Sequence, residues 1–413
     1  MTTRGGSSTQ AALATVSSGT GVAWLAGFFF SFRSAIAFIA VRLLGMDPQL
    51  GAATSVAASL LILAAAAFHS LGTGSLVSVL QLRPSRWVLL FLAFSCLSLV
   101  WSGTVSMPAS LAYWCAMAAD VATVALLLAG NSATDLGHAL MRGYIVSTCW
   151  LALLAWIIPA QTDLRLGDSD YFNTNQIANL CAFAIFFAQY LTRRSSGKWT
   201  VIAIFLGITL MRTLSKTTLA AFLLSQGFLL IRDPSITRRK KSWIAASAIL
   251  VMLLFWGLFE AYYDVYTTTG NQAETLSGRT AIWTFAIEHA LEKPWTGNGF
   301  DSMWRVMPPF GPDYFEARHA ENEILQQFYA YGVTGVALLA GLYISLFRQI
   351  RQLRHSPVRV VLSSLMLFIV VRGLAEAEPF DLLLPLWCVV LIGALLSAEM
   401  SPDCNFKSFF SAN

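Results

Sequence analysis

The stretch from Ala109 to Gly130, "ASLAYWCAMAADVATVALLLAG", holds a single charged residue, Asp120, in an otherwise apolar run. A helix that crosses a lipid bilayer needs roughly 20 consecutive, mostly apolar residues, and this run supplies them. Similar runs recur along the chain, at 22–44, 52–69, 86–103, 140–159, 175–192, 198–213, 217–231, 243–263, 323–347, 358–375 and 381–397. They lack the period-2 alternation of barrel strands, so the sequence predicts an all-α polytopic membrane protein of about twelve transmembrane helices.

The overall composition agrees with many membrane crossings. Hydrophobic residues make up 56% of the 413 residues and charged residues only 12%, and the mean hydropathy is +0.62. These values exclude a soluble globular domain. The net charge of +5 does not indicate nucleic-acid binding, because no groove pattern of basic and aromatic residues accompanies it.

The basic residues predict the orientation of the chain. If the N-terminus is cytoplasmic, the cytoplasmic connections hold Arg83, Arg86, Arg193, Arg194, Lys198, Arg232, Arg238, Arg239, Lys240, Lys241, Arg348, Arg351, Arg354 and Arg359. The opposite connections, such as "SGTVSMP", "QTDLRLGDSD" and "EAEPFD", are neutral or acidic. Short loops rich in lysine and arginine stay in the cytoplasm, so we expect both termini there.

The expected organisation follows from these spans. Residues 1–21 are expected to be a disordered cytoplasmic N-terminus without a cleavable signal peptide. Nine helices follow over 22–263, then an outward loop over 264–321, three helices over 322–397 and a cytoplasmic tail over 398–413. A loop this long in an otherwise economical chain is usually functional.

Within the long loop, "TAIWTFAIEHALEKP" (280–294) has apolar residues at helical spacing and ends at Pro294, which predicts a short helix. An aromatic segment with Trp304, Phe310, Tyr314 and Phe315 follows. Such rings either rest at the membrane interface, which is the commoner case, or stack on sugar faces.

Several cations lie at the outward ends of helices, where the positive-inside rule disfavours them. They include Arg165, Arg212, Lys216, Arg372 and the arginine of "ARHAENEIL" (317–325). A phosphate group would be a suitable partner, since guanidinium makes bidentate phosphate contacts and a helix N-terminus favours anions.

Plainer structural roles remain open for these and other polar residues. Arg212 and Lys216 could snorkel to lipid headgroups, and Arg372 could pair with Glu376 at i+4. Asn173 and Asn175 could be loop or N-cap residues. Arg33 and Asp120, inside apolar runs, have partners that cannot be identified from sequence. The six cysteines fit small core residues, and no metal-binding cluster or cofactor motif is visible.

Two segments together resemble the O-antigen ligase and O-antigen polymerase superfamily. They are "SGRTAIWTFAIEHALEKPWTGNGF" (277–300) and "HAENEILQQFYAYGVTG" (319–335). The matching residues are Gly278, Arg279, Trp283, Pro294, Gly297, Gly299, Asn322, Leu325, Gly332 and Gly335. "LSKTTLAAFLL" (214–224) and "YFNTNQIA" (171–178) are similar to further helix starts of the family. The resemblance spans roughly residues 160 to 397, and Lys216 with "GNGFDSMW" is closer to exopolysaccharide polymerases than to lipopolysaccharide core ligases.

The resemblance implies a function for the chain. It implies a metal-independent glycosyltransferase without a cofactor, in the bacterial inner membrane, whose active site faces the periplasm. Its donor would be a glycan on polyprenyl pyrophosphate. Its acceptor would be a glycan or a lipid-linked glycan, or, if the chain is an O-antigen ligase, the lipid A-core. Membrane lipids and polysaccharide export or assembly proteins are further candidate partners, and nucleic acid is not.

The resemblance also suggests site residues. In the family a histidine precedes the asparagine that aligns with Asn322, but here that position is Glu321, and His319 lies two residues earlier. Either Glu321 or His319 would be the base that activates the acceptor hydroxyl, and Arg279 would stabilise the leaving pyrophosphate. The expected substrate-binding residues are Lys216, Arg212, Arg165, Asn322, Trp283 and Arg318.

Two other functions would also use outward cations. A transporter of a lipid-linked or anionic solute predicts interrupted helices in two related halves, and we find no internal repeat. A non-catalytic scaffold for polysaccharide assembly predicts that the charges of Arg279 and Glu321 are dispensable.

Overall fold

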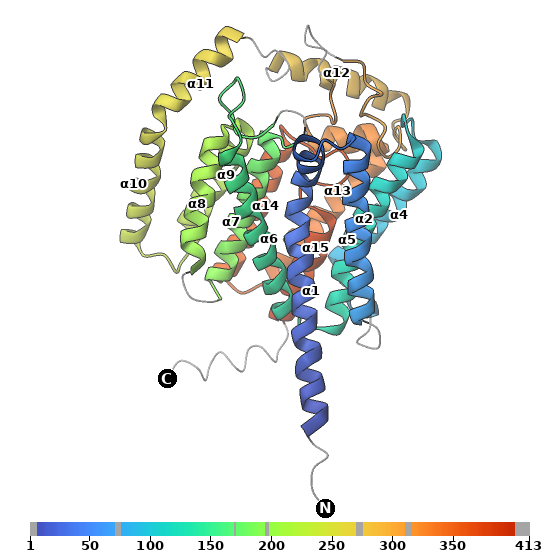
Figure 1. The fold of residues 1–413 in the computed structure, drawn as a ribbon, viewed down its shortest axis with the longest axis vertical. Helices are drawn as coiled ribbons and strands as arrows, with labels where there is room; N and C mark the ends of the chain where they lie inside the picture. The colour runs from blue at the N-terminus through green and yellow to red at the C-terminus, as the bar shows by residue number, and fades with distance from the viewer. Residues whose placement is uncertain are drawn as a thin grey trace, which may run out of the picture.

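In the computed structural model, described for residues 6–70, 76–168, 171–194, 198–269, 276–309 and 316–400, the chain is a bundle of helices (Figure 1). The first half comprises α1 (Gly6–Phe38, continued by a π-helical turn, Ile39–Leu43), α2 (Pro48–Ser70), α3 (Leu76–Leu80), α4 (Arg83–Ser98, followed by a 3₁₀ turn, Leu99–Trp101), α5 (Met107–Gly130), α6 (Ala133–Ile157) and α7 (Thr174–Thr192). The second half comprises α8 (Lys198–Thr213), α9 (Lys216–Arg232), α10 (Arg238–Leu254), α11 (Trp256–Thr269), α12 (Leu276–Glu292), α13 (Glu323–Gln352), α14 (Pro357–Gly373) and α15 (Leu386–Met400).

The predicted all-α membrane architecture is confirmed. Six helices in the described ranges are long and apolar enough to cross a bilayer, or seven if the bent pair α10–α11 is one span. Shorter apolar helices lie at 199–213 and 386–400. Each predicted apolar run contains a helix or bent pair, whereas the number of about twelve crossings stays a prediction.

Two boundaries differ from the sequence expectations. The helix α1 begins at Gly6, so residues 6–21 are helical rather than disordered, because an apolar span at their C-terminal end can propagate a helix through "STQAALA". The predicted ninth helix is broken between α10 and α11, which meet at a 46° bend. The expected short helix in the long loop is present as α12.

One end of the bundle, called the upper face below, is defined by α12, which lies across the top in Figure 1, opposite the N-terminal end of α1. The long loop contacts the α4–α5 connection there, since Gly103 N donates to Asn298 O at 3.0 Å. Phe310, Tyr314 and Phe315 lie outside the described residues.

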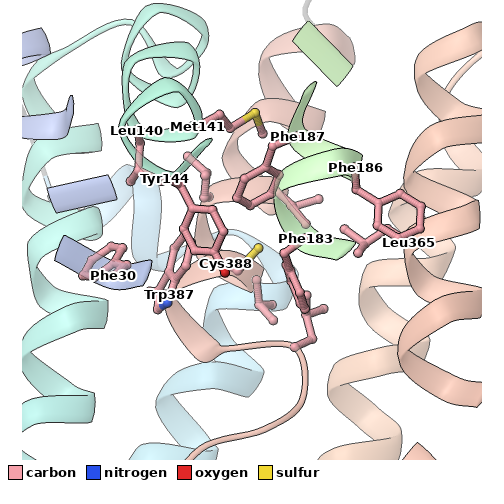
Figure 2. Packing of buried hydrophobic residues seen from close by; sticks show 14 of the residues in the cluster. Phe30, Leu140, Met141, Tyr144, Phe183, Phe186, Phe187, Leu365, Trp387 and Cys388 are labelled. Carbon is pink, nitrogen blue, oxygen red and sulfur yellow. The ribbon is translucent and has the colours of Figure 1, made fainter. Parts of the chain in front are cut away.

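The core lies where α1, α6, α7 and α15 meet (Figure 2). Trp387 packs against Phe30, with ring centroids 4.5 Å apart, and Tyr144 lies edge-on to Phe187 at 5.1 Å. The backbones of α1 and α6 approach so closely that a Cβ at Gly143 would lie 1.9 Å from the Trp24 carbonyl oxygen. Arg33 and Asp120 form an ion pair between α1 and α5, which identifies the partners that the sequence left open.

The cysteines are small packing residues in the described part of the chain. Cys96, Cys115, Cys149, Cys181 and Cys388 are all free thiols, as the sequence indicated, and Cys404 lies outside the described residues. Burial raises the cost of any thiolate at Cys181 and Cys388, which are both buried. These two thiols therefore have no chemical role that the structure suggests.

The segment 374–385 between α14 and α15, called the buried connector below, is not helical although its leucines 382–384 are almost fully buried. The predicted twelfth helix, 381–397, begins only at Leu386, and the 15 residues of α15 rise about 22 Å, less than the roughly 30 Å hydrocarbon core. Non-helical backbone at such depth is tolerated only inside protein or beside a water-filled cavity. The connector therefore belongs to the interior of the upper face.

Candidate active site

The helix α13 is sharply kinked at Gly332, and the kink determines where the site forms. Gly332 has φ +65° and ψ −158°, which no helix contains. Tyr343 Oη donates to Glu323 Oε1 at 2.8 Å, although 20 residues of straight helix would separate the two by about 30 Å. The kink therefore turns the first part of α13, and the residues just before it, back over the bundle.

The "PWTGNGF" segment fills the opening that the kink creates. Asn298 N and Gly299 N donate to the carbonyl oxygens of Tyr329 and Ala330 at 3.0 and 2.8 Å, and Val333 N donates to Pro294 O at 2.7 Å. A Cβ at Gly332 would lie 2.5 Å from the Pro294 carbonyl oxygen. The proline and glycines that resemble the family pattern thus satisfy backbone groups that the kink exposes.

Arg279 of α12 and Glu321 of the turn before α13 form the centre of the cluster. Arg279 Nη2 lies 3.3 Å from Glu321 Oε2, and each side chain is 17% exposed. Glu321 has φ +51°, in the left-handed region that non-glycine residues rarely adopt. Strained backbone of this kind often occurs at functional sites and persists because the surroundings impose it.

His319 connects Glu321 to the buried connector. Its Nδ1 accepts from Glu321 N at 3.3 Å, and its Nε2 lies 3.8 Å from Glu376 Oε1. These partners assign the proton of the neutral imidazole to Nε2, which faces the Glu376 carboxylate. The pKa of His319 is lowered overall because burial is the largest influence, although the nearby Glu376 and Glu378 carboxylates raise it.

Glu376 is the buried carboxylate of the cluster, and its side chain is 3% exposed. Burial, and next the charge of Glu321, raise its pKa to about 7, while Arg372, His319 and Arg279 lower it. Arg372 Nη2 lies 3.9 Å from Glu376 Oε2, and Arg372 Nη1 lies 3.9 Å from Glu378 Oε1. The pairing of Arg372 with Glu376 at i+4 that the sequence left open is therefore present, but as a buried contact across a helix end, since α14 ends at Gly373.

Part of this polar pair has unused hydrogen-bonding capacity. Neither Glu376 Oε2 nor Arg372 Nη1 is within hydrogen-bond distance of another polar atom in the described structure. Buried groups of this kind are uncommon in folded proteins and usually have a reason. Here they can be satisfied by a polar substrate group or by water.

Polar residues at the start of α9 contact Arg372 and so extend the cluster. Arg372 Nε donates to Thr218 Oγ1 at 3.4 Å, and Ser215 Oγ contacts Thr218 Oγ1 at 3.0 Å and Asn175 Oδ1 at 2.7 Å. Asn173 caps α7 by accepting from Asn175 N at 2.7 Å, which gives it the capping role that the sequence left open. Polar groups therefore run from α7 through α9 to Glu376 and Arg279.

Lys216 lies two residues before Thr218 and faces a cavity between α9 and α11. Its Nζ lies 5.4 Å from the centre of the Tyr262 ring. The cavity has a volume of about 320 Å³ and is lined by Leu214, Lys216, Leu219, Phe259, Tyr262 and Tyr263. A cationic amine beside an apolar groove suits a lipid whose headgroup is anionic.

The other expected substrate-binding residues have structural contacts. Arg212 Nη1 donates to Leu164 O at 2.5 Å, and Arg165 Nε lies 2.5 Å from Asp163 Oδ2, so both arginines brace the α6–α7 connection. Asn322 caps α13, accepting from Leu325 N at 3.0 Å and donating to Leu374 O at 2.9 Å.

Trp283 and Arg318 flank the cluster. Trp283 Nε1 donates to Ala320 O at 3.0 Å, and the Arg318 guanidinium lies 5.4 Å from the centre of the Trp304 ring. A second apolar cavity, of about 370 Å³, opens beside Trp283 and Asn322. It is lined by Trp283, Ile287, Asn322, Ile324, Leu325, Phe328 and Val336.

The fold also creates a group with the spacing of metal ligands. One atom each of His319, Glu321 and Glu376 lies within 4.8 Å of the others. The sequence shows no such cluster, because Glu376 is far from the other two along the chain. The same carboxylates contact Arg279 and Arg372, whose positive charges oppose binding of a cation.

Glu376 is the member of the cluster that sequence reasoning did not assign to the site, and Arg372 was expected to meet phosphate but was not placed with Arg279 and Glu321. The signal available was the charged stretch "VVRGLAEAEPF" at the end of an apolar run, where buried charges are costly and usually functional. Its position relative to His319 follows only from the buried connector.

The fold and the cluster define a polytopic helical membrane protein whose upper face gathers guanidinium groups, carboxylates and an imidazole. Residues 201–340 match the family model described as O-antigen ligase. Over 175 residues the chain is 28% identical to a protein named "O-antigen ligase" from Pseudomonas aeruginosa. These findings show that part of the chain is similar to the O-antigen ligase family, as the sequence motifs indicated.

The similarity is limited in extent. The aligned stretch covers 42% of this chain and 40% of the length of that relative. The family match includes Lys216, Arg279 and Glu321 but ends before the buried connector. The similarity therefore does not extend to the activity, substrates or partners of the whole protein.

Proposed function

We propose that this chain transfers a glycan from a polyprenyl pyrophosphate carrier onto a hydroxyl of an acceptor sugar. The observation that carries the proposal is the cluster of Arg279, Glu321, His319 and Glu376, which joins α12, the turn before α13 and the buried connector. It places a hydrogen-bond donor for an anion and acceptors for a proton side by side.

The reaction requires both kinds of group. The bond between the anomeric carbon and the pyrophosphate oxygen breaks, and a new bond forms between that carbon and the acceptor oxygen. The acceptor proton passes to a protein base, and the pyrophosphate leaves with increased negative charge. Preorganised cations beside the leaving group stabilise that charge, which is the role of Arg279 and Lys216 here.

A lipid-linked donor fits the surroundings of Lys216. The apolar cavity between α9 and α11 would hold the hydrocarbon chain of the donor, and the Lys216 amine at the wall of the cavity would contact its phosphate. Arg212 and Arg165 contribute indirectly, because they hold the α6–α7 connection beside α9.

Glu321 is the base that we favour. Both ring nitrogens of His319 have partners, because Nδ1 accepts from Glu321 N and Nε2 faces Glu376. Glu321 Oε2 lies 3.3 Å from Arg279 and its Oε1 lies 3.8 Å from His319 Nδ1, and an ionised carboxylate can accept several hydrogen bonds at once. In this arrangement His319 positions Glu321, and Glu376 in turn positions His319.

Polymerisation is the form of transfer that we propose, because Lys216 and "GNGFDSMW" are closer to polymerases. Ligation to a lipid A-core is the second candidate, which the name of the Pseudomonas aeruginosa relative favours. A purified full-length chain, given lipid-linked repeat units alone, makes a ladder of longer glycans if it is a polymerase. Transfer would be refuted if no new glycosidic bond formed in that assay and none formed when a lipid A-core acceptor was added.

The proposed location is the bacterial inner membrane, with the upper face toward the periplasm and both termini in the cytoplasm. Glu288→Cys on α12 and Lys240→Cys on α10 lie at exposed positions of opposite predicted sides. An impermeant thiol reagent added to spheroplasts should label the first and not the second. The reverse pattern would contradict the proposed orientation.

A further inference from the structure

The turn from Asp301 to Met307, in the aromatic part of the long loop, is held firmly against the bundle. Ser110 Oγ donates to Asp301 Oδ2 at 2.6 Å, and Tyr329 Oη donates to Ser302 O at 3.1 Å. Asp301 and Arg305 both have left-handed backbones, with φ of +54° and +61°. A turn that is strained at two positions and tied to the bundle at its first two residues is preorganised.

Trp304 at the centre of this turn packs inward onto two aromatic rings. Its ring centre lies 6.4 Å from that of Tyr113 on α5 and 6.1 Å from that of Phe380 in the buried connector. Tyr113 and Phe380 stack on each other at 4.1 Å. All three rings are half-buried, so Trp304 is part of the upper face and not a separate membrane anchor.

Two guanidinium groups rest on the same indole. The Cζ atoms of Arg305 and Arg318 lie 4.9 and 5.4 Å from the centre of the Trp304 ring, and both residues are exposed. Each contact is a favourable cation–π interaction, and it orients the guanidinium group against the ring. Guanidinium groups that stack through their faces still donate hydrogen bonds in their planes, so both arginines can bind an anion at the edge of the Trp304 ring.

We propose that Trp304, Arg305 and Arg318 form a binding site for an anionic substituent, a carboxylate or phosphate, carried by the acceptor glycan. Arg318 directly precedes His319, and Phe380 lies two residues after Glu378, so the site adjoins the reacting groups. Half-buried aromatic rings beside it suit the apolar face of a sugar. The chain would thus select acidic over neutral acceptors.

The test is a binding measurement on the full chain in nanodiscs of neutral lipid. Two disaccharides serve as probes: glucuronosyl-β-1,4-glucose and its neutral counterpart, cellobiose. We expect the acidic probe to bind about tenfold more tightly, as one charge-assisted contact allows. Arg305→Gln should abolish that preference, and Arg305→Lys should keep part of it because the charge remains.

Arg351→Gln is the matched control, since Arg351 also lies over an aromatic ring, Phe347, at the opposite end of α13. It should keep the preference for the acidic probe. Equal binding of both probes to the wild type, or an unchanged preference in Arg305→Gln, would overturn the proposal.

A lipid headgroup is the other possible source of an anion at this site. Native mass spectrometry of protein purified from membranes that contain phosphatidylglycerol distinguishes a bound lipid from a bound glycan. Phosphatidylglycerol retained by the wild type and lost in Arg305→Gln would assign the site to lipid and overturn the glycan assignment. The inference rests on the proposed glycan transfer, but its test measures binding alone, so loss of transfer activity would not produce the same result.

Discussion

Replacing Glu321 by glutamine tests the proposed base with the least disturbance of the fold. The change keeps the size of the side chain and an oxygen for Arg279, which lies 3.3 Å from the carboxylate, but removes its basicity. A positioned general base is typically worth about 10²–10⁴ in rate, equivalent to about 3–5 kcal/mol of activation free energy. We therefore expect transfer by Glu321→Gln to fall by at least about a hundredfold.

The structural cost of the same substitution is much smaller. Both side chains of the ion pair are partly exposed, and such pairs contribute about 0–1 kcal/mol to stability. Glu321 precedes the cap residue Asn322, where a negative charge near the helix N-terminus adds about 0.3–1 kcal/mol. A shift of only a few degrees in the melting temperature is therefore expected.

The assay compares purified Glu321→Gln, His319→Ala and wild type with a lipid-linked donor, at equal amounts of folded protein. His319→Ala should cost much less than Glu321→Gln, and Glu321→His should retain partial activity. An active Glu321→Gln beside an inactive His319→Ala would show that the imidazole is the base. Near wild-type transfer by both variants would refute a catalytic role for the cluster.

Further predictions concern geometry, strain, ionisation and metal. Arg279→Lys should lose most activity at normal protein level, because a single ammonium cannot make bidentate phosphate contacts; wild-type glycan lengths in cells that carry it would contradict this. Gly332→Ala should lower the melting temperature and transfer together, because its Cβ would lie 2.5 Å from the Pro294 carbonyl oxygen and its backbone conformation, open essentially only to glycine, costs an L-residue about 1–3 kcal/mol; unchanged melting would refute the kink argument. The pKa of Glu376, raised to about 7, favours its protonated form in the fold, so its contribution to stability is full below about pH 4.5 and is lost as the pH rises through 7. Glu376→Gln should therefore lose less melting temperature than the wild type between pH 5 and 8, and equal losses would exclude this titration. EDTA should leave transfer unchanged, whereas inactivation reversed by a divalent cation would assign a metal to His319 and its two carboxylate neighbours.

The glycine and proline pattern shows how far a local resemblance reaches. "PWTGNGF" and the glycines of α13 were recognisable in the sequence, but their role was not. The structure shows that they form one unit, in which the loop amides satisfy the carbonyl groups exposed at Gly332. A substitution there would affect the chemistry indirectly, by moving Glu321 and His319.

The sequence by itself determined the all-helical membrane architecture and the short helix α12. Hydropathy runs and helix stop signals are local, and a bilayer imposes nearly the same length on each span, so they can be read one segment at a time. Only the tertiary structure decided the kink in α13, the break between α10 and α11, and the buried connector. These depend on which distant segments supply hydrogen bonds and apolar contacts, as when Glu376 meets His319 across the end of α14. No window of neighbouring residues contains that information, because it arises when separate helices pack together.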